Sequence, residues 1–192
     1  MEKRTSRLWA PTQATPETLR IVVMGVTGCG KSTVASEIAT AIGARFCDGD
    51  ALHSVESVAK MRRGEPLADE DRWPWFERIA AFLNAEPAHA VIACSALKKV
   101  YRDYLRREVT NVRFLFLDAS RDVITHRVSG RQGHYMPVSL VTSQFAALER
   151  PENEDRVSTM VADLPVESIV LAFLDALSAP PGAPGSEGPG RL

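Results

Sequence analysis

A glycine-rich segment near the start of the chain carries residues that can bind phosphate. Residues 25–32 read G-V-T-G-C-G-K-S, which matches the pattern G-x-x-x-x-G-K-[ST]. Its glycines let successive backbone N–H groups point into one concavity, and the positive end of the following helix dipole faces the same point. We expect Lys31 to reach the β- and γ-phosphates of ATP and the Ser32 hydroxyl to bind Mg²⁺. The predicted nucleotide contacts are Gly25, Thr27, Gly28, Cys29, Gly30, Lys31, Ser32 and Thr33.

Two aspartates follow the second apolar segment of the chain. Asp48 and Asp50 are two residues apart, so an extended backbone sends both carboxylates to one side. At the carboxyl end of a strand they would lie in the crevice where open α/β sheets bind ligands. We assign Asp48 to Mg²⁺, directly or through water, and Asp50 to the proton of an acceptor hydroxyl. The alternative is a polar turn, because Asp-Gly is common in turns.

Cations occur in two further segments. Arg127 and Arg131 lie four residues apart beside the polar segment 129–137, which predicts a mobile lid, and they would stabilise charge on a transferring phosphoryl group. His134, within that segment, is a weaker candidate for a substrate contact, because it is a lone histidine.

A basic helix carries a second cluster that suits a carboxylate or phosphate on the acceptor. A solvated helix face is the alternative for both groups. The basic helix contributes Lys98, Lys99, Arg102 and Arg106.

Short apolar runs alternate with helical patterns along most of the chain. This alternation predicts an α/β fold, with a five-stranded parallel sheet between two layers of helices. A strand precedes the glycine-rich segment and a helix follows it, which argues against a chance match to the phosphate-loop pattern. The predicted strands are 19–24, 44–47, 88–94, 112–117 and 157–161, and the helices 31–42, 54–63, 69–84, 97–107, 122–128, 139–148 and 166–177.

The chain length and composition predict one globular domain. With 192 residues, the chain is long enough for one well-buried domain and short for two. We place the domain at residues 19–178, between a disordered extension, 1–18, and a disordered Pro/Gly-rich tail, 179–192. A net charge of -1 argues against a nucleic-acid partner, and no apolar run is long enough to span a membrane. Three cysteines, an odd number, favour the reducing cytoplasm.

The rest of the sequence narrows the class of phosphate-loop protein. No N-K-x-D segment occurs, so the guanine-reading element of a GTPase is missing, and the chain is small for a motor or transporter ATPase. A compact size favours a small-molecule kinase that uses ATP and Mg²⁺. Cys29 is interpreted as a small filler, not as a nucleophile. The open alternatives are a kinase of shikimate or a nucleoside monophosphate on the same fold, and a nucleotide-binding regulator without turnover.

Several longer stretches resemble the gluconokinase family, small P-loop kinases with a nucleoside-monophosphate-kinase-like fold. The resemblance implies D-gluconate as acceptor at its 6-hydroxyl, with 6-phospho-D-gluconate and ADP as products, and a homodimer. A Gly-rich turn, usual in shikimate kinases, is missing at residues 94–96. The stretches are D-G-D-A-L-H (48–53), K-M-R-R-G-E-P-L-A-D-E-D-R-W-P-W (60–75), C-S-A-L-K-K-V-Y-R-D-Y-L-R (94–106), R-Q-G-H-Y (131–135) and Q-F (144–145).

The resemblance also implies roles for single residues. Gluconate needs hydroxyl-reading groups and a cation for its carboxylate, and Asp50, His53, Arg102 and the Lys98/Lys99 pair supply these types. It further implies adenine contacts from Arg127 and from residues 163–166. Ser54 and Ser57 depart from the family's usual Pro and Asn, which leaves the fine substrate preference open. Trp73 and Trp75 are read as core residues, with a pocket wall as the alternative.

Overall fold

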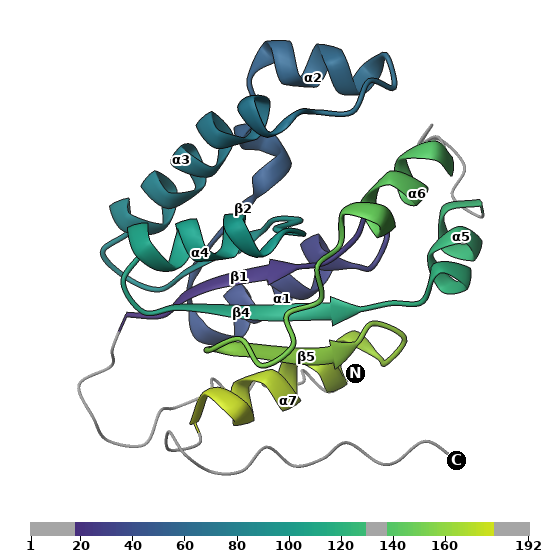
Figure 1. The fold of residues 1–192 in the computed structure, drawn as a ribbon. Coiled ribbons are helices and arrows are strands. Elements are labelled where there is room, and N and C mark those ends of the chain that lie inside the picture. The colour runs from purple at the N-terminus through teal and green to yellow at the C-terminus, as the bar shows by residue number, and fades with distance from the viewer. Residues whose placement is uncertain (1–17, 130–137, 179–192) are drawn as a thin grey trace, which may run out of the picture.

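Five strands form one parallel sheet, as the alternating pattern predicts (Figure 1). The sheet is seen in a computed structural model that describes residues 18–129 and 138–178. The predicted terminal extensions and nearly all of the predicted lid therefore lie outside the described residues. In the sheet order β2-β3-β1-β4-β5, the strands are β1 (Arg20–Met24), β2 (Arg45–Asp48), β3 (Ala90–Ala93), β4 (Val112–Asp118) and β5 (Val157–Val161).

Helices cover both faces of this sheet (Figure 1). One face packs against α1 (Lys31–Ile42) and α7 (Val166–Ser178), and the other against α3 (Asp69–Ala85) and α4 (Lys99–Glu108). Within the described ranges, no helix is long and apolar enough to cross a membrane. The other helical elements are the 3-10 turn η1 (Gly49–Leu52), α2 (Val55–Arg62), α5 (Arg121–Ser129) and α6 (Val138–Ala147).

The side chains of β1 alternate between two cores. Ile21 and Val23 belong to the core under α1 and α7, whereas Val22 and Met24 belong to the core under α3 and α4. All four side chains are buried, because helices cover both faces of the strand. The predicted three-layer α/β/α sandwich is confirmed.

The parallel register brings the carboxyl ends of the strands to one edge. Asp48 at the end of β2 is level with Ala93 of β3, which pairs with Val23 of β1. The glycine-rich segment starts two residues after Val23, so the register places it at the same edge of the sheet as Asp48 and Asp50. This edge of the sheet is therefore where a ligand is expected.

The two serines that depart from the family pattern form the start of α2. The Ser54 hydroxyl accepts a hydrogen bond from the backbone N–H of Ser57 at 3.1 Å, and Ser57 is buried. A serine in this position stabilises a helix start by about 1 kcal/mol relative to alanine. The departure at Ser54 thus has a structural explanation in helix capping, whereas the Ser57 hydroxyl only accepts a hydrogen bond from Ser54 at 3.2 Å.

Candidate active site

The glycine-rich segment has the backbone of an anion-binding loop. Gly25, Gly28 and Gly30 have φ values of 141°, 77° and 100°, which L-residues with side chains rarely adopt. At Gly25 a Cβ atom would lie 2.8 Å from the carbonyl oxygen of Leu117 in β4, so the loop packs tightly on the sheet. No side chain of the described residues caps the start of α1, and its first N–H groups therefore point toward the place where phosphate would bind.

The residues predicted to bind nucleotide and metal lie together at this loop. The Ser32 hydroxyl donates a hydrogen bond to Asp48 Oδ2 at 2.7 Å, although the two residues lie on different elements. Asp48 Oδ1 also accepts from the backbone N–H of Asp50 at 3.0 Å, which orients the following turn. The Lys31 ammonium group donates to the carbonyl of Val26 at 3.0 Å. Lysine, hydroxyl and carboxylate thus surround the mouth of the loop.

The two buried thiols near the loop are inert at neutral pH. Cys29 is buried, and this burial raises its pKa. Burial likewise raises the pKa of Cys94, at the end of β3, to about 12. A protonated thiol is a poor nucleophile, so the interpretation of Cys29 as a filler agrees with its surroundings.

Two further predicted residues, Asp50 and His53, lie in and directly after η1. The sequence analysis had proposed no helix or strand at this 3-10 turn. The Asp50 side chain is 89% exposed, whereas that of His53 is 5% exposed and stacks on Trp75 with ring centroids 4.2 Å apart. His53 Nε2 lies 4.0 Å from Asp50 Oδ1. Burial lowers the pKa of His53, so its ring is neutral at pH 7. Within the described residues, His53 Nδ1 is buried without a hydrogen-bond partner.

A cleft of about 330 Å³ joins these residues to the other side of the site. Lys31 of the phosphate loop and Asp50 of the turn line it, and so does Gln144 of α6. The cleft also reaches His53 and Lys98, which the sequence analysis assigned to the acceptor. Five residues predicted for the site therefore line one cleft, and Trp75 adds an aromatic wall; the five are Thr27, Lys31, Asp50, His53 and Lys98.

Two cations of the cleft share one carboxylate. The Lys98 ammonium group lies 2.9 Å from both oxygens of Asp69, and Arg72 Nη1 lies 3.2 Å from Asp69 Oδ1. The Tyr101 hydroxyl also donates to Asp69. Hydrogen bonds from Lys98, first, and from Tyr101 lower the pKa of Asp69. Because two positive groups face one negative group, this end of the cleft suits an anionic part of a ligand.

Arg102, by contrast, is buried outside the cleft where the sequence analysis expected it to contact the substrate. Its side chain is 1% exposed and does not line the cleft. Its Nε donates to Glu154 at 2.9 Å, and Nη1 donates to the carbonyls of Ala96 and Leu97. Nη2 donates to the carbonyl of Glu149, so the guanidinium joins α4 to the chain after α6. The shared helical spacing with Lys98 did not reveal this burial.

Of the three residues predicted at or beside the lid, Arg127 lies within the described residues. Arg127 at the end of α5 donates to the carbonyl of Ala162 at 3.0 Å and lies 3.6 Å from Asp163. Arg127 therefore lies beside Asp163, the first residue of the segment 163–166 that the family resemblance implies for adenine contacts. Arg131 and His134 lie outside the described residues.

Two residues of the site were missed by the sequence analysis. Gln144 Oε1 accepts the backbone N–H of Thr27 in the phosphate loop at 2.7 Å. Arg72 lines the cleft beside Lys98. Both lie in stretches that carry the family resemblance, but no local spacing connects them with the phosphate loop or with the basic helix.

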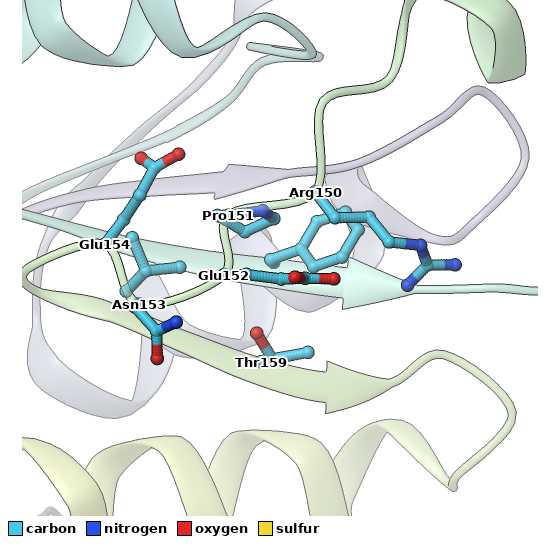
Figure 2. Close-up of a pocket in the computed structure, with 8 residues that line it drawn as sticks. Arg150, Pro151, Glu152, Asn153, Glu154 and Thr159 are labelled. Carbon is cyan, nitrogen blue, oxygen red and sulfur yellow. The ribbon is translucent and has the colours of Figure 1, made fainter.

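A second cavity, of about 290 Å³, lies outside this cleft beside β5 (Figure 2). Phe116 and Thr159 of the sheet and Arg150 and Glu152 of the preceding loop line it. None of the described residues predicted for the site lines this second cavity. The cleft at Lys31 and Asp50 is therefore the candidate active site.

Comparison with known proteins first defines the class. The sequence profile of the shikimate kinase family matches residues 27–167, so this chain is a small P-loop kinase. A crystal structure of shikimate kinase from Bacteroides thetaiotaomicron, with a TM-score of 0.61, is only 17% identical and therefore shows the fold alone. It covers 84% of this chain and 99% of that one.

More similar relatives then define the particular family. The chain is 46% identical to the thermosensitive gluconokinase of Escherichia coli over 70% of its own length and 74% of that protein. It is 41% identical to the thermoresistant gluconokinase of the same organism, over 81% and 91%. A crystal structure of a gluconokinase from Sinorhizobium meliloti is 44% identical, with a TM-score of 0.77 over 83% and 93%. The chain belongs to the gluconokinase family.

Proposed function

We propose that this enzyme transfers the γ-phosphoryl group of ATP to the 6-hydroxyl of D-gluconate, which gives 6-phospho-D-gluconate and ADP. The observation that carries the proposal is one cleft that joins Lys31 of the phosphate loop, Asp50 and the cationic pair Lys98/Arg72. Identity of 41% or more to two gluconokinases supports the choice of acceptor.

The geometry supports a direct transfer. Asp50 accepts the proton of the 6-hydroxyl while that oxygen forms its bond to the γ-phosphorus. The bond between the γ-phosphorus and the bridging oxygen of the β-phosphate breaks, and ADP leaves with that oxygen. Lys31 stays beside the β- and γ-phosphates and stabilises their charge. Arg127 and Arg131 are proposed to stabilise the same charge from the side of α5.

Ser32 and Asp48 are the residues proposed for Mg²⁺. Their oxygens are within hydrogen-bond distance of each other, and hard oxygen ligands of this kind suit the ion. Mg²⁺ usually takes one or two protein ligands together with phosphate oxygens and water. When bound, it would neutralise charge on the phosphates of ATP.

Gluconate recognition is proposed to use both ends of the cleft. Lys98 and Arg72 bind the carboxylate, because they share only Asp69 as a counter-charge in the described structure. His53 is proposed to contact a substrate hydroxyl, because it lines the cleft beside Asp50. His134 remains a further proposed contact outside the described residues.

A coupled ADP-release assay tests the proposed reaction. Purified enzyme is given ATP and Mg²⁺ with gluconate, shikimate, AMP or CMP as acceptor. We expect gluconate alone to raise the rate well above the rate without acceptor. Equal rates with and without gluconate would contradict the proposal, and stimulation by shikimate or a nucleotide would favour the alternative kinases.

Two broader expectations follow from the family resemblance. We propose a homodimer in the cytoplasm, and the odd number of cysteines supports the reducing compartment. Light scattering coupled to size-exclusion chromatography tests the first point, because a monomer would elute with the 21.0 kDa mass of one chain.

A further inference from the structure

Helix α3 holds the turn that carries the proposed base at both ends. The indole Nε1 of Trp75 donates to the carbonyl of Gly49 at 2.6 Å. Arg78 Nε donates to the carbonyl of Leu52, also at 2.6 Å. Gly49 and Leu52 are the first and last residues of η1, and Trp75 and Arg78 are three residues apart on one face of the helix. A single helix face thus binds the whole turn.

The turn has few bonds of its own. Its 3-10 hydrogen bond, from the N–H of His53 to the carbonyl of Asp50, is long at 3.4 Å. Asp48 Oδ1 accepts one further hydrogen bond, from the N–H of Asp50. The Asp50 side chain is 89% exposed, so its position is set by the backbone of the turn. The contacts from α3 therefore decide where this carboxylate lies.

Close packing leaves the turn little room to move. A Cβ atom at Gly49 would lie 2.4 Å from the carbonyl oxygen of Ala93 in β3 and 3.5 Å from the indole of Trp75. The turn is therefore inserted between the sheet on one side and α3 on the other. The stack of His53 on Trp75, with an interplanar angle of 15°, extends this packing beyond the end of the turn.

We infer that Trp75 and Arg78 are positioning residues for phosphoryl transfer, because they hold η1 so that Asp50 faces the acceptor hydroxyl. This inference rests on the role of Asp50 in the proposed function. A shift of about 1 Å in a reacting group can lower a rate by about a hundredfold, so a modest relaxation of the turn is measurable. Arg78 does not line the cleft, and it reaches the site only through the backbone of Leu52.

The test uses two variants that each remove one donor. Trp75→Phe keeps an aromatic ring over His53, and Arg78→Met keeps most of the apolar stem. We expect kcat with gluconate to fall by about tenfold in each variant, while KM for ATP changes by less than about twofold. Trp73→Phe is the matched control, because the ring contacts of Trp73 are with Phe76, Tyr101 and Tyr104, and within the described residues it makes no hydrogen bond to the turn. Its kcat should stay unchanged.

A double-mutant cycle with Asp50→Asn separates this inference from the proposed function. If the turn acts through Asp50, Trp75→Phe and Arg78→Met should lower kcat by less than about twofold in the Asp50→Asn background. The full tenfold loss in that background, or an unchanged kcat for both variants in the parent, would overturn the inference alone. A near-normal kcat for Asp50→Asn itself would overturn the proposed base and the inference with it.

Discussion

At the scale of single residues, two aspartates that share one short segment have different surroundings. Asp48 is bonded to Ser32 and to the backbone of the turn, whereas Asp50 extends into the cleft. A carboxylate with a hydroxyl beside it suits a metal ion, and an exposed carboxylate at the cleft suits a proton acceptor. The two positions should therefore respond differently to loss of charge.

Asp48→Asn tests the metal role without removing the bond that orients the turn. The amide oxygen of asparagine still accepts the N–H of Asp50, but the negative charge is lost. We expect the Mg²⁺ concentration for half-maximal activity to rise by about tenfold, with a smaller change in kcat at saturating Mg²⁺. An unchanged Mg²⁺ requirement in a titration of activity would contradict the assignment.

Lys98→Ala tests the proposed carboxylate contact. Loss of a charge-assisted hydrogen bond, about 1.5–3 kcal/mol, should raise KM for gluconate by at least about tenfold and leave KM for ATP unchanged. Arg107→Ala is the control, because Arg107 is an exposed cation on α4 that pairs with its neighbour Glu108. Equal effects of the two substitutions in steady-state kinetics would argue for a general charge effect instead.

At the scale of elements, one buried ion pair joins α4 to the segment that precedes β5. The side chains of Arg102 and Glu154 are 1% and 7% exposed, and Arg106 also bonds to Glu154. Burial raises the pKa of Glu154, but hydrogen bonds from Arg102 and Arg106 outweigh this effect, so its pKa is lowered overall. Arg102 also bonds to the carbonyl of Leu97, which lines the cleft. The ion pair therefore holds the backbone of Leu97, a residue that lines the cleft, in place.

Arg102→Met should destabilise the fold instead of weakening gluconate binding. Without Arg102, Glu154 keeps Arg106 as its only ion-pair partner and the carbonyls of Ala96 and Leu97 lose their donor, which should cost about 3 kcal/mol, the low end for breaking a buried pair. Urea unfolding measures this loss, and Arg107→Met, at an exposed position, should change the free energy of unfolding by less than about 0.5 kcal/mol. A normal stability together with a raised KM for gluconate would restore the substrate contact expected from the sequence.

At the scale of the whole molecule, several carboxylates pair with cations of residues 98–102, and hydrogen bonds lower the pKa values of these carboxylates. Asp69 bonds to Lys98, Asp103 bonds to Lys99, and Glu154 bonds to Arg102. In each case the folded-state pKa lies below its ordinary value. The unfolded chain therefore binds protons more readily than the folded chain as the pH falls through these values.

Lowering the pH should consequently destabilise the folded protein over a defined pH range. The stabilisation from these carboxylates is fully present above their unfolded pKa values of about 4 and is lost as the pH falls through the lower folded values. We expect Tm to decline slightly between about pH 7 and pH 5, because burial lowers the pKa of His53 and the unfolded chain therefore takes up that proton first, and to fall more steeply below about pH 4. Thermal melts followed by circular dichroism measure this, with Glu154→Gln expected to show a weaker dependence. A level Tm down to about pH 3 would contradict the expectation.

Much of this protein is determined by local sequence. The phosphate loop was predicted from its glycines and lysine, because the loop uses its own backbone to form the anion site. The helix at 31–42 and the strand at 157–161 have the predicted bounds. The other predicted elements begin and end within two residues of their predicted bounds. Apolar periodicity and the alternation of strands with helices are local patterns, so the fold class could be derived from the sequence.

The tertiary structure decided which polar side chains face the cleft. Lys98 and Arg102 are equivalent by spacing, but Lys98 meets Asp69 from α3, whereas Arg102 is buried against Glu154, 52 residues away. Gln144 reaches Thr27 across 117 residues. The physical reason is that burial and the choice of a charge partner depend on residues brought together only by folding, which no spacing within one helix contains.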